Sequence, residues 1–415
     1  MALFLWEMKK IWRPVLLLAI LFIGVVYYPI RPGFYLDMTD HDVIGSAELQ
    51  LSIGWLKQYG STIDRLERAE LEDQLIGLKE DFARQITNVS GASEAGITGY
   101  DSYLAWEDDF YEKEDPPEEE RALHQSLLDN TNVYTIGMLI SFMDNYDRLA
   151  AGGSAIDTGA SIDPPSPAAK ASIRRITQAE ENKGVYGFLP SSMVNDIDAF
   201  FHYFAIWCSF SAILLLAPAL VNDRLYHTRP MQWASRRGRK VISTQIGSAL
   251  VSGLLLMLLN CAAYLGPFLS TGTLQFWRCP MVSVWPGSFP WFDWTYGQYL
   301  LALLGLTALL TLATAGFITI LSWYSANYVS VLLKAIPLIF VLEWGAIPWI
   351  MDGAGRFSGK PVRLIGQPGA EFIGGILTAA LALFLCSLVY RLQRKKNLFI
   401  SSRTTSPIYA ASSAA

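Results

Sequence analysis

Six long apolar runs and one acidic block divide this 415-residue chain. The runs cover approximately residues 12–30, 199–221, 241–266, 298–322, 328–351 and 369–390. Each is close to or longer than the ~20 helical residues that cross the hydrocarbon core of a bilayer. The pattern predicts an all-α polytopic membrane protein with six transmembrane helices, because a spanning helix satisfies its backbone polar groups internally.

The charges are segregated. Of the 37 acidic residues, 31 lie between Arg31 and Asp198 beside 13 basic ones, which gives this block a formal charge of −18. Basic residues cluster elsewhere, next to apolar runs, at Lys9 to Arg13, Arg224 to Lys240 and Arg391 to Arg403. The positive-inside rule therefore predicts a multi-pass membrane protein with both termini cytoplasmic and the acidic block outside. We expect the membrane to be the cell membrane of a bacterium.

This topology divides the chain into four parts. Residues 1–30 hold an amphipathic N-terminal helix and the first span, and residues 31–198 form the extracytoplasmic domain. Residues 199–400 form a five-helix transmembrane domain with a cytoplasmic loop at 222–240, and residues 401–415 form a disordered cytoplasmic tail. The first run ends in Tyr27-Tyr28-Pro29 without a small-x-small cleavage site, so we expect it to remain as a span.

The acidic block is expected to be mostly helical. Leu71, Leu75, Leu78 and Phe82 recur at helical spacing, and Asp115-Pro116-Pro117-Glu118 predicts the start of a helix that runs toward Arg148. The block has no cysteine, so its helices must bury a core rather than depend on disulfides. Its charge should attract cationic or amphiphilic molecules.

The loop after the second run carries the most specific pattern. Asn222-Asp223-Arg224 is followed by Thr228, by Ser235-Arg236-Arg237-Gly238-Arg239-Lys240, and then directly by the third run. This order resembles the cytoplasmic loop of type-two ABC transporter permeases, the membrane subunits of ATP-driven exporters. The amphipathic N-terminus, which corresponds to the family's elbow helix, and the large outer domain also match. The chain departs from the family at Asp223, where Glu is usual, at His227 in place of Gly, and at Gln245 in place of Lys.

The resemblance implies a set of partners. Two permease subunits, identical or homologous, would surround a central path, and two cytoplasmic ABC ATPase subunits would bind ATP and Mg. The substrate would be amphiphilic, lipid-like or a peptide. The residues implied in ATPase coupling are Asp223, Arg224, Thr228, Met231, Trp233, Arg236, Arg237, Arg239 and Lys240. The alternative is that the basic residues only fix topology and contact anionic lipid.

We expect no ATPase activity and no bound cofactor or metal in this chain itself. Ala354 to Pro361 nearly spells a phosphate-binding loop, but Ala354 replaces its first glycine and Pro361 its Ser/Thr. The segment is therefore interpreted as an outer turn. Nothing in the sequence indicates nucleic-acid binding.

Two features inside the runs are candidates for the translocation path. Thr307, Thr311 and Thr314 form a hydroxyl stripe, which either lines the path or bonds to its own helix backbone. Glu343 lies at membrane depth, where a carboxylate marks a functional site or pairs with a neighbour, and Lys334 on the same run can snorkel to the inner surface.

Two other classes of function stay open. A membrane-embedded transferase could use Asp37, Asp40 and Asp42 to hold a divalent metal just outside the first span. A membrane-anchored sensor or binding protein would use the acidic domain alone, with the spans as a passive scaffold.

Overall fold

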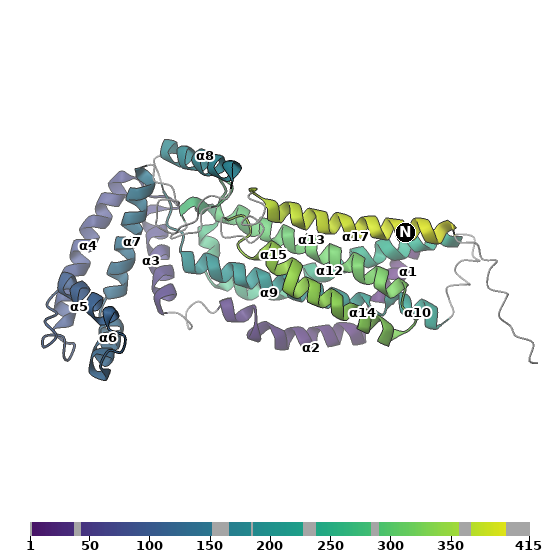
Figure 1. The fold of residues 1–415 in the computed structure, drawn as a ribbon, viewed down its shortest axis with the longest axis horizontal. Coiled ribbons are helices and arrows are strands. Elements are labelled where there is room, and N and C mark those ends of the chain that lie inside the picture. The colour runs from purple at the N-terminus through teal and green to yellow at the C-terminus, as the bar shows by residue number, and fades with distance from the viewer. Residues whose placement is uncertain are drawn as a thin grey trace, which may run out of the picture.

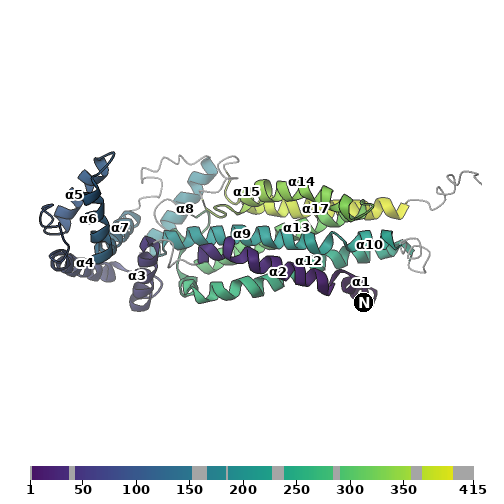
Figure 2. The same ribbon diagram turned by 90° about the horizontal axis from the view of Figure 1, so that it is seen from below.

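The computed structural model describes residues 2–36, 43–151, 166–183, 186–226, 238–283, 290–356 and 367–395. All elements in these ranges are helices, which confirms the all-α prediction. Long helices lie side by side in an elongated bundle, and a separate group of helices lies beyond one end of it in both views (Figures 1 and 2). We call this the domain end and the opposite one the far end.

Five helical segments in the described ranges are long and apolar enough to cross a membrane, as in a multi-pass membrane protein. They are α9 (Ser191–Leu216) continued by α10 (Ala219–Leu225); α12 (Val241–Ser270); α13 (Tyr296–Trp323); α14 (Tyr328–Val341) continued by η6 (Leu342–Ala346) and α15 (Ile347–Met351); and α17 (Ala370–Lys395). A sixth is present only if α1 (Ala2–Ile11) and α2 (Pro14–Ile30), which meet at 50°, form one span. Helix α13 packs against α9, α12 and α17.

The remaining helices form the acidic domain and the connections of the bundle. The acidic domain contains α3 (Val43–Tyr59), α4 (Arg65–Ile86), α5 (Tyr100–Glu112), α6 (Glu118–Asn130), α7 (Val133–Ala150) and α8 (Pro167–Lys183). Short turns of helix lie at η1 (Gly33–Leu36), η3 (Gly238–Lys240), η4 (Thr273–Arg278) and η5 (Met281–Ser283).

One buried core extends from the acidic domain into the bundle. Trp55 of α3 lies 5.1 Å from Phe142 of α7 and 6.2 Å from Phe188, measured between ring centroids. Phe188 precedes α9. The buried cluster that contains Phe188 continues along α9 to the middle of the bundle. A second cluster around Phe82 and Leu127 fills the distal part of the domain. These buried cores confirm the prediction drawn from the missing cysteines.

Two helices differ from the sequence pattern. Helix α9, which contains the second run, begins eight residues before it at Ser191, because Met193, Val194 and Ile197 are buried and the charge of Asp198 is paired inside the protein. The single helix expected from Glu118 toward Arg148 is broken between α6 and α7. There, Asn132 donates from its backbone to Gln85 and from its side chain to the Leu78 carbonyl, which turns the chain onto α4.

The capping box of α4 gives a test of the domain's local stability. Asp64 accepts hydrogen bonds from the backbone of Leu66 and Glu67, and the Glu67 side chain accepts from the Asp64 backbone. We expect Asp64→Ala to destabilise α4 by about 1 kcal/mol, because these N–H groups lose their acceptor. Hydrogen exchange of the α4 amides in the full chain measures this. Asp73→Ala, an exposed change within the same helix, is the control; equal exchange in both variants would contradict the prediction.

Candidate functional site

At the far end of the bundle, Asp223 is buried in a cluster of polar side chains from three helices. The Lys10 ammonium of α1 lies 3.1 Å from both carboxylate oxygens of Asp223, and the Gln245 amide of α12 donates to the same carboxylate at 2.8 Å. Lys10 also lies 2.6 Å from the Glu7 carboxylate. Asp223 is only 6% exposed and Glu7 4%, so the ion pairs and hydrogen bonds here are largely shielded from water.

The neighbours of Asp223 bind the end of α13 and the start of α14. The Arg224 guanidinium donates to the carbonyl groups of Trp323 at 2.9 Å and Ser325 at 2.8 Å. A cation at this position also complements the negative end of the α13 helix dipole. On the other side of the chain, the Tyr328 hydroxyl of α14 donates to Asn222. Asn222, Asp223 and Arg224 therefore connect α10 to α1, α12, α13 and α14.

The predicted coupling residues fall into two groups. Asp223 and Arg224 belong to this cluster, and Lys240 is exposed at the end of η3. Thr228, Met231, Trp233, Arg236 and Arg237 lie outside the described residues, as does the side chain of Arg239. In the sequence, the cluster directly precedes the segment 227–237, which carries the other predicted coupling residues.

The sequence did not indicate the part played by Lys10. Gln245 occupies the position where the resembled family has Lys, and the cation that pairs with Asp223 comes instead from α1. One feature of the sequence could have indicated this role. Glu7 and Lys10 are three residues apart in a mostly apolar helix, and this spacing places both side chains on one face. Leu5 and Trp6 of that helix are exposed while Glu7 is buried, so α1 turns the face that carries Glu7 and Lys10 toward the bundle.

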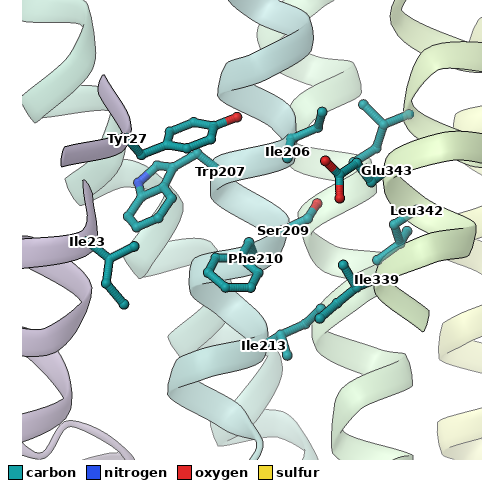
Figure 3. A pocket seen from close by; sticks show the side chains of 11 residues that line it. Ile23, Tyr27, Ile206, Trp207, Ser209, Phe210, Ile213, Ile339, Leu342 and Glu343 are labelled. Atoms are coloured by element: carbon teal, nitrogen blue, oxygen red, sulfur yellow. The ribbon is translucent and has the colours of Figure 1, made fainter. Parts of the chain in front are cut away.

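A cavity of about 210 Å³ lies midway along the bundle between α2, α9 and the α14–η6–α15 helix (Figure 3). Its walls are mostly apolar and include Tyr27, Trp207 and Phe210. Glu343 lies at its edge in η6, a five-residue π-helical turn, and Figure 3 shows its carboxylate directed toward α9. Turns of this kind interrupt α-helices frequently at functional sites. The hydroxyl of Ser209, also in the wall, is buried without a hydrogen-bond partner among the described residues.

The other residues predicted for the translocation path do not line this cavity. Thr307, Thr311 and Thr314 are fully buried, and each hydroxyl donates to the carbonyl four residues earlier at 2.8–2.9 Å. This confirms the back-bonded interpretation. The Lys334 ammonium donates to the Tyr324 carbonyl at 3.1 Å, near the far end, as expected for a snorkelling side chain.

A buried ion pair connects three segments at the domain end. Arg356 pairs with Asp198 of α9 and donates to Asn195 at 3.2 Å, while the Tyr299 hydroxyl of α13 donates to Asp198. Burial lowers the pKa of Arg356 to about 10, so the guanidinium keeps its charge at neutral pH. The adjacent Gly355 has a φ of 74° and donates to the Glu371 carboxylate at 2.6 Å. The described part of the phosphate-loop-like segment is therefore a structural turn.

No protein-family model, curated protein or solved structure matches this chain. Its function must be inferred from its own residues. Asp37, Asp40 and Asp42, the candidates for a transferase metal site, lie outside the described residues. Within the described ranges, no group of three or more His, Cys, Asp and Glu side chains is placed to hold a metal ion.

Proposed function

We propose that this chain is the membrane-spanning permease subunit of an ATP-driven ABC exporter. The observation that supports this most is the cluster around Asp223 and Arg224. A cytoplasmic ATPase can move a permease only through contacts at the membrane surface, so the contact segment must be firmly attached to the spanning helices. Here the residues that directly precede the segment 227–237 in the sequence connect α10 to α1, α12, α13 and α14.

The same contacts give a path for the movement. A force on the loop acts on Asp223 and Arg224, and thus on the elbow helix α1 and on the junction between α13 and α14. Helix α14 continues through η6, which carries Glu343 at the cavity. Closure of the two ATPase subunits around ATP and Mg would in this way shift the helices that surround the cavity.

Glu343 supports the presence of a second permease subunit, identical or homologous. Its side chain is exposed at membrane depth, on a segment whose neighbours Phe340 and Trp344 are 59% and 78% exposed. Lipid can cover the apolar neighbours, but contact with hydrocarbon would cost an ionised carboxylate several kcal/mol, about 2.5–3.5 on insertion scales. A second subunit that encloses a water-filled path between the two chains removes this cost.

The proposed substrate is amphiphilic, lipid-like or a peptide, moved from the cytoplasm or inner leaflet to the outside. The cavity supports this class, because an apolar wall with a carboxylate and an unpartnered hydroxyl suits a molecule with both apolar and polar parts. The acidic domain would lie outside the cell, with both termini and the loop 222–240 in the cytoplasm of a bacterial cell.

Transport should depend on the charge of Glu343. We expect Glu343→Gln to lower the ATPase and transport activity of the complex, reconstituted with its ATPase subunit, by about fivefold or more, because the variant removes the charged group from the path. Thermal unfolding should change little, since the side chain is exposed. Glu343→Asp, which keeps the charge, is the control and should retain most of the activity. Normal activity of Glu343→Gln would show that the carboxylate has no part in transport.

A further inference from the structure

The acidic domain contains a second cavity, of about 360 Å³, which the transport proposal does not use. Its walls come from α3, α5, α6 and α7 and from Ser191, the first residue of α9. The polar and aromatic residues in the walls include Glu48, Tyr100, Tyr103, Glu107 and Tyr134. The volume falls at the lower end of the range for small-molecule sites, about 300–1,000 Å³.

Two carboxylates are held in the walls by polar contacts. Glu48 of α3 is 8% exposed and accepts hydrogen bonds from the Ser191 backbone at 3.2 Å and the Ser192 hydroxyl at 2.5 Å. Glu107 of α5 accepts from the Tyr103 hydroxyl at 2.5 Å, and a ring nitrogen of His124 lies 3.5 Å from the same carboxylate. These contacts fix the positions of the two carboxylates at the wall, and carboxylates held in place in this way give the cavity a preorganised preference for a cation.

The aromatic rings add a second preference for the same kind of ligand. The rings of Tyr100 and Tyr103 lie 6.1 Å apart and border the cavity, with Tyr134 on α7 as a further ring in its wall. The faces of such rings attract ammonium groups, most strongly where water is excluded. Tyr100 already accepts one cation in this way, because the Lys79 ammonium lies 5.1 Å from its ring centroid.

We propose that this cavity binds the ammonium group of a small organic cation. Carboxylates supply the charge complement, and tyrosine rings supply surfaces for the methylene or methyl groups around the nitrogen. The surrounding block, with a formal charge of −18, raises the local concentration of cations. The inference does not depend on the transport proposal, since all the residues it uses belong to the acidic domain and the first turn of α9.

Calorimetric titration of the full chain, in an uncharged detergent at physiological salt, tests the site. The probes are choline, which carries a quaternary nitrogen, butylammonium, which carries a primary one, and dimethylbutanol, in which carbon replaces the choline nitrogen. At least one cation should bind about tenfold or more tightly than dimethylbutanol, because only a cation gains from the carboxylates and ring faces. Equal binding of dimethylbutanol, or no binding of either cation at millimolar concentration, would overturn the proposal.

Paired variants separate the cavity from the general negative charge of the domain. Glu107→Gln and Tyr134→Leu should each weaken binding about tenfold, while Asp108→Asn and Tyr111→Leu, matched changes at exposed positions on α5, should leave it unchanged. If Asp108→Asn weakens binding as much as Glu107→Gln does, the attraction comes from diffuse surface charge and the site is wrong.

Gly137 allows the cavity to be filled without removing a charge. It lies in α7 at the cavity wall, and a Cβ added there meets no atom closer than the Tyr100 hydroxyl at 3.9 Å. Leucine also favours helix more than glycine does, so Gly137→Leu should fold. Its side chain would occupy the space of the ligand, and binding should fall at least tenfold. Binding that survives in folded Gly137→Leu would place the cation elsewhere.

Discussion

The Asp198→Leu variant is expected to be less stable than the natural chain by about 3–5 kcal/mol. Arg356 is 3% exposed, and removal of Asp198 would leave its guanidinium buried without its carboxylate partner. The Tyr299 hydroxyl would lose its acceptor as well. Because this pair joins α9 to the turn before α17, its loss should loosen the domain end of the bundle.

A double-mutant cycle identifies the cause. Arg356→Met alone should also be strongly destabilising, since it leaves the Asp198 carboxylate buried without its cation. The combination of Asp198→Leu with Arg356→Met should recover much of the loss, because apolar residues of similar volume often replace a buried ion pair at little cost. The measurement is denaturant unfolding in detergent. Additive losses in the double variant would show that the two residues do not act as a pair.

The largest functional effect is expected in the loop between α10 and η3. Replacement of Arg236, Arg237 and Arg239 together with Glu should release the ATPase subunit, because reversed charges at an interface place like charges together and cost several kcal/mol. The measurement is co-purification of the ATPase with the full-length chain. Since the same arginines help to keep the loop in the cytoplasm, accessibility labelling of a cysteine placed in the loop must accompany it.

A milder variant separates docking from topology. Met231→Ala with Trp233→Ala keeps every charge and removes only the apolar side chains, which should carry a large share of the binding energy if they dock in a cleft. We expect ATPase recovery to fall by about tenfold or more, with the loop still accessible from the cytoplasm. Full recovery of the ATPase with both variants would refute the assignment of this loop.

The helices of the bundle could be predicted because the thickness of a bilayer fixes how many apolar residues a spanning helix needs, and runs of that length are easily recognised in a sequence. The fifth run was predicted at residues 328–351, and the helix occupies Tyr328–Met351. The start of α9 at Ser191 could not be predicted for a physical reason. Asp196 and Asp198 interrupt the apolar pattern, whereas in the structure Asp198 is buried and paired with a residue far along the chain.

The candidate site could be predicted only in part. The position of Asp223 and Arg224 at the end of a span drew attention to this segment, but their partners Lys10, Gln245 and Ser325 come from distant parts of the chain. Hydrophobic periodicity reports which face of a helix is buried, and it carries no information on which polar groups meet across helices. The cavity beside Glu48 and Glu107 was likewise invisible, because three-dimensional packing creates it from several helices.

The composition of the complex that forms in the native membrane tests the central claim most directly. The full-length chain is extracted in a mild detergent, purified by a tag on the C-terminal tail, and analysed by native mass spectrometry. The account predicts two permease chains with two copies of an ATPase subunit that carries a Walker motif, and ATP hydrolysis by the purified complex. Recovery of the intact chain alone, or only with proteins that lack such a motif, would contradict the proposal that this protein is the permease of an ATP-driven exporter.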